Sequence, residues 1–557
     1  MNRLARASAL ALLVSFSFAQ TSSLPDILND ELDRNFRALK EKGDPAPYFM
    51  AYQATDQEAC LVGATLGALQ SSSCGGNRVL DVTLRVGSPK LDNYHRVQGE
   101  RPVFTSAAQL PAENYPGALR QRLWRETDRV YRLAAERLIK IRTSTQVRVA
   151  REDDSPDFSV EDSATRGEPA RKLAFQVRDW ESRVRRWSAA FVGRPGILTS
   201  SATVQARRET KYLVSTEGTR ITHGRGFSRI AIAAQTRAGD GMDLATSEAF
   251  DAEEPGSLPD DKTILTAVNR IAQRLNDLRQ APVAEPFVGP AILSGRAAAV
   301  FFHEIFGHRV EGHRQKDEAE GQTFTKSVGT RVLPEFLSVH FDPTLRSAGG
   351  IDLNGYYRYD DEGILAQRVT VVDTGVLRAF LMSRSPVLAF DKSNGHGRRQ
   401  PGYEVVSRQS NLIVESSKQV PEARLRELLR EEIRKQNKPY GLHFEEVTGG
   451  FTQTRRGGLQ AFAVVPVVVY RIYADDRADE LVRGVEIVGT PLASFGKIVA
   501  TADRQEVFNG YCGAESGAVP VSAVAPALLV SEIETQRKEK AQDRPPLLSR
   551  PPVGAGR

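Results

Sequence analysis

Three of the chain's eight histidines fall within residues 303–313, which read HEIFGHRVEGH. An apolar, helix-forming run at 297–302 comes directly before them. Imidazole is the commonest metal ligand in proteins, and a neighbouring carboxylate can deprotonate a water molecule for hydrolysis. The segment therefore predicts a metal-dependent hydrolase with His303 and His308 as ligands and Glu304 as base. The alternative is a partly exposed helix that happens to be rich in histidine.

The two candidate ligands are five residues apart, one more than in the common His-Glu-x-x-His motif. Five residues turn a regular α-helix through about 500°, which leaves His303 and His308 about 140° out of register. Both can bind one ion only if the helix is distorted between them. We expect a π-type turn or a break there, and Gly307 is a position that tolerates one.

The first residues have the pattern of a Sec-type signal peptide. Arg3 and Arg6 precede an apolar run at 7–18, and small residues at 17 and 19 mark a cleavage site before Gln20. We predict a signal peptide over 1–19 and a periplasmic or secreted protein; the alternative is an apolar helix kept in the fold. Because no later segment approaches about 20 apolar residues, no membrane span is expected in the mature chain.

The chain has three cysteines, Cys60, Cys74 and Cys512. In an oxidising compartment, Cys60 and Cys74 are a natural disulfide pair around a short stretch rich in Gly, Ala and Ser. Cys512 is then left over. Metal ligation or a buried, inert thiol would each account for it.

The charge of the chain argues against one class of partner. Its 75 basic residues are nearly balanced by 69 acidic ones, and we find no long basic run with interleaved aromatic residues. Nucleic-acid binding is therefore not expected. A hydrophobic content of 40% is typical of a globular protein with a substantial core.

Periodicity indicates an α+β fold in two parts. We expect helices at 24–40, 115–147 and 261–279, a loop at 153–169, and strands at 48–86, 209–216 and 228–235. Prolines at 282, 286 and 290 end the third helix and place a domain boundary at 285/286, which gives domains over 20–285 and 286–540. In the second domain, strands are expected at 366–373, 377–383, 461–472 and 484–488, with a helix at 421–436. Residues 541–557, rich in Pro and Arg, are predicted to be a disordered tail.

Several blocks of the second half follow one another as in a known family, and there the chain resembles the TldD/PmbA metallopeptidases. The blocks read FVGPAIL (287–293), YDDEG (359–363), AQR (366–368), GVL (375–377), NGHGRR (394–399), GYCG (510–513) and VPVS (519–522). The resemblance implies an N-terminal α+β domain with long helices and a curved sheet, then a β-rich catalytic domain. It also implies a homodimer, or a heterodimer with a family paralogue.

For the site, the resemblance implies zinc bound by His303, His308 and Cys512, with Glu304 as the base. Three protein ligands leave a fourth position open, as in catalytic zinc sites. His313 departs from the family pattern, which often has Asp there. It could support a ligand, contact the substrate, or replace Cys512 as a ligand.

The resulting hypothesis is a zinc metallopeptidase of HExxxH type that hydrolyses peptides or unfolded protein segments. One alternative is a non-catalytic partner subunit of a TldD/PmbA-type protease. Another is a metal-dependent amidase that acts on cell-wall peptides.

Overall fold

The computed structural model describes residues 23–97, 107–145, 153–456, 462–475, 477–489 and 494–538. The predicted signal peptide (1–19) and the predicted tail (541–557) lie outside these residues. Among the helices that are described, none is both long and apolar enough to cross a membrane.

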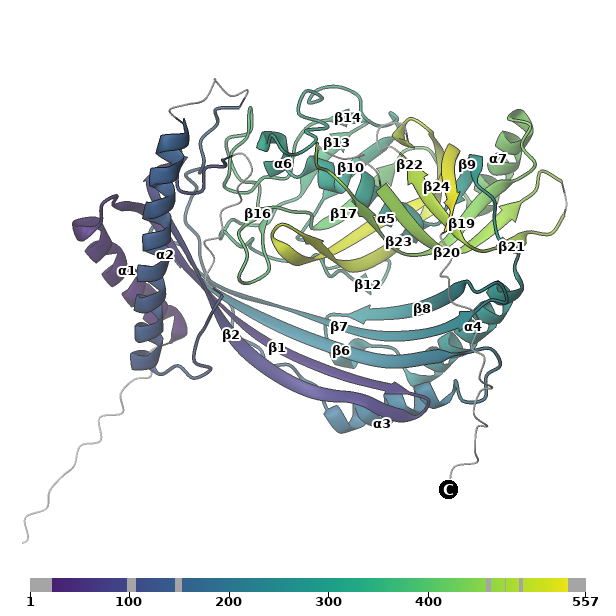
Figure 1. The fold of residues 1–557 in the computed structure, drawn as a ribbon, viewed down its shortest axis with the longest axis horizontal. Helices are drawn as coiled ribbons and strands as arrows, with labels where there is room; N and C mark the ends of the chain where they lie inside the picture. The colour runs from purple at the N-terminus through teal and green to yellow at the C-terminus, as the bar shows by residue number, and fades with distance from the viewer. Residues whose placement is uncertain are drawn as a thin grey trace, which may run out of the picture.

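The N-terminal half is a long curved sheet (Figure 1). In the described chain its main path runs β3 (Leu91–Asp92), β2 (Ala68–Ser88), β1 (Pro47–Thr65), β6 (Thr199–Ser215), β7 (Arg220–Arg237) and β5 (Thr165–Gly167). Two further strands join its sides, β4 (Ala108–Gln109) on β2 and β8 (Asp243–Ala252) on β7. The long strands are antiparallel.

Helices cover one face of this sheet. α1 (Leu24–Lys42) and α2 (Pro116–Thr145) pack at one end, and α3 (Val177–Ala189) and α4 (Asp261–Gln280) at the other. Because side chains alternate along a strand, even-numbered residues of β1, such as Met50 and Val62, enter the two cores beneath the helices. Odd-numbered residues, such as Gln53, face the C-terminal half of the chain.

The long helices expected near 24–40, 115–147 and 261–279 are confirmed. Helix α3 was missed, because its buried residues are few and the remainder of the helix is strongly charged. The expected loop at 153–169 is wrong in one detail, since it contains the short strand β5.

The C-terminal half is built on a sheet that closes on itself. β24 (Gly517–Arg537), β22 (Val485–Gly489), β20 (Phe462–Ile472), β19 (Gly441–Thr452) and β9 (Phe287–Leu293) pair in that order, and β9 pairs again with β24. Helix α5 (Gly295–Ile305) packs against β9, β19, β20 and β24. Every residue of α5 except Arg296 is buried. A helix that is apolar on all sides is stable only inside a core, and this ring of strands provides one.

Further strands extend the closed ring. β23 (Ile498–Ala514) forms a long hairpin with β24, and β17 (Asn411–Ser416) continues from β24 to β10 (Leu337–Phe341), β13 (Val369–Asp373) and β14 (Val376–Leu377). α7 (Glu422–Lys435) packs on the outside against β9 and β23. The smaller elements are η1 (Pro255–Ser257), η2 (Gly307–Val310), α6 (His313–Lys316), β11 (Ser347–Ala348), β12 (Ile351–Asp352), β15 (Gly397–Arg398), β16 (Val406–Ser407), β18 (Gln419–Val420) and β21 (Glu480–Val482).

The helix at 421–436 and the strands at 461–472 and 484–488 are confirmed, with ends that differ by a residue or two. The expected strand at 377–383 is wrong. Only its first residue belongs to a sheet strand, β14. Further along, Leu381 pairs instead with the histidine segment: its N–H donates to the Val310 carbonyl at 2.9 Å, and its carbonyl accepts from the Gly312 N–H at 2.8 Å.

The C-terminal half lies over the concave face of the curved sheet (Figure 1). Asp361 joins the two halves. Its carboxylate accepts from Gln53 Nε2 at 3.2 Å, pairs with Lys211, and accepts from the backbone N–H of Arg399 at 2.9 Å. The α+β fold expected from the sequence is confirmed, with a helix-covered curved sheet followed by a β-rich half.

Candidate active site

The first feature of the site is the end of helix α5. His303 and Glu304 lie in its last turn, and the helix stops at Ile305. A short 3₁₀ segment, η2, then carries His308. The break that the five-residue spacing predicts is therefore present. The expected π-type turn is wrong, because the chain after the break forms a 3₁₀ turn, which is narrower than an α-helical turn. The rings of His303 and His308 lie 5.1 Å apart between centroids.

The position of the break is set by close packing at Gly307. A β-carbon added there would lie 1.9 Å from Oε1 of Gln409. Gln409 is fully buried, and its Nε2 donates to the carbonyl of His303 at 3.2 Å. Arg309 holds the same turn by donating to the carbonyls of Glu304 and Ile305 at 3.1 and 2.9 Å. These carbonyls have no partner within the helix, so a cationic side chain stabilises the helix end.

The third candidate ligand comes from a distant strand. Cys512 on β23 places its Sγ 3.2 Å from Nε2 of His308, although 204 residues separate them. One ligand atom from each of His303, His308 and Cys512 lies within 4.8 Å of the others. Two imidazoles and a thiolate are ligand types that zinc favours, so these residues fit such an ion.

The charges around Cys512 favour its ionised form. Burial alone would raise the pKa of the thiol, but His308, His303 and Arg408 hold that pKa well below its usual range. Burial also works against protonation of His308, yet Cys512 and Glu311 raise the pKa of His308 to about 10. A cation that binds here must displace the His308 proton, so its affinity falls as the pH is lowered.

Glu304 lies beside these residues. Its Oε2 is 4.0 Å from Nε2 of His308. Burial raises the pKa of Glu304, and the neighbouring His303 and His308 oppose that rise. Space for the side chain depends on Gly450 in β19, where an added β-carbon would lie 2.7 Å from Cγ of Glu304.

His303, Glu304, His308 and Cys512 all line one cavity of about 780 Å³. The loop end of β19 and the turn between β23 and β24 form its other walls, and Arg229 of β7 reaches it from the curved sheet. Arg229 is fixed there by Asp251 and by a 2.9 Å hydrogen bond to the carbonyl of Asn509. The two halves of the chain therefore both contribute to the cavity.

A family model described as the PmbA/TldA metallopeptidase C-terminal domain matches residues 288–537. This match covers the ring of strands, α5 and the converging side chains. This half of the chain is therefore similar to the C-terminal domain of the TldD/PmbA metallopeptidases.

Individual relatives agree with this assignment. A metalloprotease of Methanocaldococcus jannaschii is 27% identical over 233 residues, which is 41% of this chain and 47% of the relative. A zinc metalloprotease TldD homolog of Saccharolobus solfataricus is 24% identical over 247 residues, 44% of this chain and 51% of the relative. The chain thus spans about half the length of the curated relatives it matches.

One solved structure is similar over nearly the whole chain. TldE from Thermococcus kodakarensis superposes with a TM-score of 0.62 at 12% identity, covering 90% of this chain and 100% of that one. The likeness shows that both halves of the chain share the fold of that protein.

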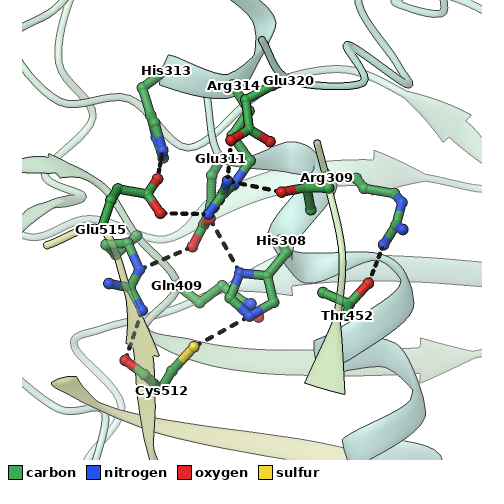
Figure 2. A network of polar contacts seen from close by, with 12 residues as sticks. His308, Arg309, Glu311, His313, Arg314, Glu320, Gln409, Thr452, Cys512 and Glu515 are labelled. Carbon is green, nitrogen blue, oxygen red and sulfur yellow. Dashed lines mark hydrogen bonds and ion pairs between the residues drawn. The ribbon is translucent and has the colours of Figure 1, made fainter. Parts of the chain in front are cut away.

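A buried network surrounds His308 in this site (Figure 2). Glu311 accepts from Nδ1 of His308 at 3.2 Å and from Arg314 and Arg408 at 2.8 and 3.2 Å. Burial would raise the pKa of Glu311, but His308, Arg314 and Arg408 lower it strongly. Arg408, itself fully buried, also donates to the carbonyl of Cys512 at 2.7 Å. Two of the three candidate ligands are therefore tied to one carboxylate.

His313 is directed away from the ligand group. Its Nε2 pairs with Glu515, which also accepts from Arg314 at 3.0 Å, and Arg314 in turn contacts Glu311 (Figure 2). The structure therefore places His313 among the residues that support the site, and the ligand group of the described chain does not include it.

Cys60 and Cys74 lie opposite each other in the β1–β2 hairpin and form a disulfide, while Cys512 is free and buried. The supporting residues were missed from the sequence, among them Glu311, Arg408, Gln409 and Glu515. One signal was present: residues 407–411 read SRQSN, a polar run, yet every one of them is fully buried. Buried polar groups require partners, so such a run in a β-rich half marks an internal network.

Proposed function

We propose that this chain is a zinc-dependent metallopeptidase that hydrolyses peptide bonds in peptides or unfolded protein segments. The observation that carries the proposal is the convergence of His303, His308 and Cys512 beside Glu304 in one cavity. The metalloprotease names of the curated relatives support the same reaction class.

A zinc ion held by the three side chains would polarise a peptide carbonyl and lower the pKa of a water molecule. Glu304 is the residue that accepts the proton from that water and passes it to the leaving amine. Because burial raises its pKa, Glu304 is a stronger base than an exposed glutamate.

Glu311 prepares His308 for binding. It accepts a hydrogen bond from Nδ1, so that once the Nε2 proton is displaced the ring is held in the tautomer whose Nε2 lone pair faces Cys512. A histidine held in this way keeps its orientation without an ion. Less conformational entropy is then lost when an ion binds.

Two further parts of the proposal concern the setting of the enzyme. We propose export to the periplasm or the medium, supported by the signal-like sequence at 1–19 and by the Cys60–Cys74 disulfide. We also propose a dimer, with a second copy or with a paralogue such as a TldE-type protein, supported by the TldE fold.

The test is metal analysis combined with hydrolysis of an unfolded protein and of a cell-wall peptide. We expect about one zinc per chain in the wild type, with strong loss in His303→Ala, His308→Ala and Cys512→Ala but not in His313→Ala. Glu304→Gln should keep its zinc and cleave unfolded protein at least ~100-fold more slowly.

The proposal fails if Glu304→Gln cleaves at nearly the wild-type rate. It also fails if zinc is lost from His313→Ala and retained by Cys512→Ala. A wild type that holds zinc but hydrolyses neither substrate would be a non-catalytic subunit, and cleavage of the cell-wall peptide alone would mean an amidase.

A further inference from the structure

A second cavity, of about 590 Å³, lies between the curved sheet and the C-terminal half. Its floor consists of β1, β6 and β7, and its roof contains residues 357–361 and 398–401. Tyr511 lines both this cavity and the one that holds the candidate ligands. Because Tyr511 directly precedes Cys512, the two cavities adjoin within one residue of the candidate metal site.

The floor of this cavity is charged where an apolar surface would be expected. Even-numbered residues of β6 and β7 pack beneath the helices, as Val204 and Ile230 do. The odd-numbered positions in the middle of these strands face the C-terminal half, and several of them carry charge, namely Arg207, Glu209, Lys211 and Arg225. A sheet face covered by another part of the same chain normally packs apolar side chains, so the charges indicate a solvent-filled, functional space.

Cations outnumber carboxylates in the lining. The cations are Arg207, Arg208, Lys211, Arg225, Arg398 and Arg399, and the carboxylates are Glu58, Glu209, Asp360 and Asp361.

The carboxylates are already engaged. Asp361 is shared by Lys211 and the Arg399 N–H, and Asp360 accepts from three backbone N–H groups. Glu58 accepts from the backbone N–H of Leu173, and Glu209 lies between Gln57 and Arg225.

Arg398 is the main source of uncompensated charge. The residue is buried, with only 5% of its surface exposed. It donates to the carbonyl of Gln409 and stacks on Tyr357, but within the described chain no carboxylate reaches ion-pair distance. Burial lowers the pKa of Arg398 despite the nearby Tyr357 and Asp361, and Arg225 lowers it further. A buried guanidinium without a counter-ion is costly, and it suits an anion that binds when the cavity is filled.

Arg207 stands at the junction of the two cavities. It is exposed, has no carboxylate partner among the described residues, and lies over the ring of Tyr511 at 5.6 Å. An anion that passes along this wall would meet Arg207 as well as Arg398. An extended peptide advances about 3.3 Å per residue, so a few residues beyond the scissile bond are enough to enter this space.

We infer that this cavity is a subsite for a carboxylate of the peptide substrate, recognised by Arg398 and Arg207. The inference rests on the proposed peptidase function, and it narrows the substrates to peptides that bring a carboxylate to a fixed distance from the scissile bond. Arginine suits this task because its planar, forked donors match a carboxylate. The carboxylate belongs either to the C-terminus of the peptide or to an acidic side chain.

The test is fluorescence anisotropy with zinc-loaded Glu304→Gln protein, which binds peptides without cleaving them. Three labelled Ala/Ser octapeptides are compared: one with a free C-terminal carboxylate, one with a C-terminal amide, and one amide with Glu as its last residue. We expect the free acid to bind at least ~10-fold more tightly than the amide, the scale of one lost charge-assisted hydrogen bond. If the Glu-containing amide binds as tightly as the free acid, the subsite recognises acidic side chains. If it binds as weakly as the plain amide, the subsite recognises the C-terminal carboxylate.

The variants are Arg207→Gln and Arg398→Lys in the same Glu304→Gln background. Both variants should reduce the difference in affinity between the free acid and the amide. Because Arg207 is exposed, its replacement should leave the fold intact. The control is Arg132→Gln, which removes an equally basic residue from the exposed surface of α2. Equal affinity for all three peptides, or a preference that survives both variants, would overturn the subsite.

Failure of the proposed function looks different. If the wild type hydrolyses no peptide but the Arg207-dependent preference for a carboxylate persists, the peptidase proposal is wrong and the proposed binding site stands. If the wild type cleaves the free acid and the amide equally well, the subsite proposal is wrong and the peptidase proposal stands.

Discussion

Arg408 donates a hydrogen bond of 2.7 Å to the backbone carbonyl of Cys512. The same guanidinium contacts Glu311, whose other oxygen accepts from His308. A candidate ligand on β23 and a candidate ligand on η2 are thus positioned through one buried pair, and neither can shift without disturbing the other.

Glu311→Gln should weaken zinc binding by about 10- to 100-fold, the usual effect of removing the hydrogen-bond partner of a metal-binding histidine. It should also destabilise the fold by about 3–5 kcal/mol, because Arg408 and Arg314 lose their buried counter-charge. Chelator competition and chemical unfolding measure the two effects. Glu335→Gln, at an exposed pair with Arg331, is the matched control. Unchanged zinc affinity would show that Glu311 does not position His308.

Gly307→Ala should displace the turn between the two histidines, because the new β-carbon would overlap Gln409. We expect reduced zinc content and a loss of about 1–3 kcal/mol in stability, as for other overpacked core sites. Gly513→Ala is the control, since an added β-carbon there meets nothing within 4 Å. Gln409→Ala combined with Gly307→Ala should recover part of the zinc content; if it recovers none, the steric explanation is wrong.

Asp361 should make the stability depend on pH in the acid range. Burial would raise its pKa, but Lys211 and Arg399 lower that pKa to about 2, from 3.8. A carboxyl group with a lowered folded-state pKa stabilises the fold fully above its unfolded pKa, and that contribution is lost as the pH falls from about 4 to about 2. The contribution is about 2 kcal/mol. The free energies of unfolding of the wild type and of Asp361→Asn, measured in urea, should converge as the pH falls through this window. Asp128→Asn, at an exposed pair on α2, should follow the wild type.

The disulfide can be counted by thiol labelling of denatured, zinc-stripped, unreduced protein. We expect one reactive thiol per chain, at Cys512. Replacing Cys60 and Cys74 by serine should lower stability by up to about 3 kcal/mol, the chain-entropy value for a short loop. Three reactive thiols would mean that the pair is reduced in the protein as isolated, and would count against export.

Much of the fold could be predicted because its elements are long and regular. The helices α1, α2 and α4 carry enough turns for their apolar stripes to stand out, whereas α3 buries Trp180, Val184 and Trp187 on a short, charged helix. The pairing of β9 with β24 joins segments more than 200 residues apart, and no local pattern indicates it. The failed strand at 377–383 has the right composition, but its backbone pairs with the histidine segment.

The candidate site was predictable in part. The spacing of His303 and His308 required a break in the helix. The narrow 3₁₀ form of that break depends on Gln409, which packs on Gly307 from a different part of the chain. The odd number of cysteines left metal ligation open for Cys512, but only the family resemblance joined it to His303 and His308, because nothing near residue 512 relates it to His308. Arg408 lies in the polar run at 407–411, but its contact with Glu311, like that of Glu515 with His313, became visible only in the fold.

The closed ring of strands around α5 has a consequence during synthesis. The histidines precede Cys512 by some 200 residues, and the strand that closes the ring, β24, comes later still. Contacts so distant in sequence form late, because the intervening chain must be ordered first. A nascent chain therefore carries the first two candidate ligands without the third, and without the core that buries their helix. The proposed peptidase activity would then appear only at the end of folding, and unfinished copies would not cut one another.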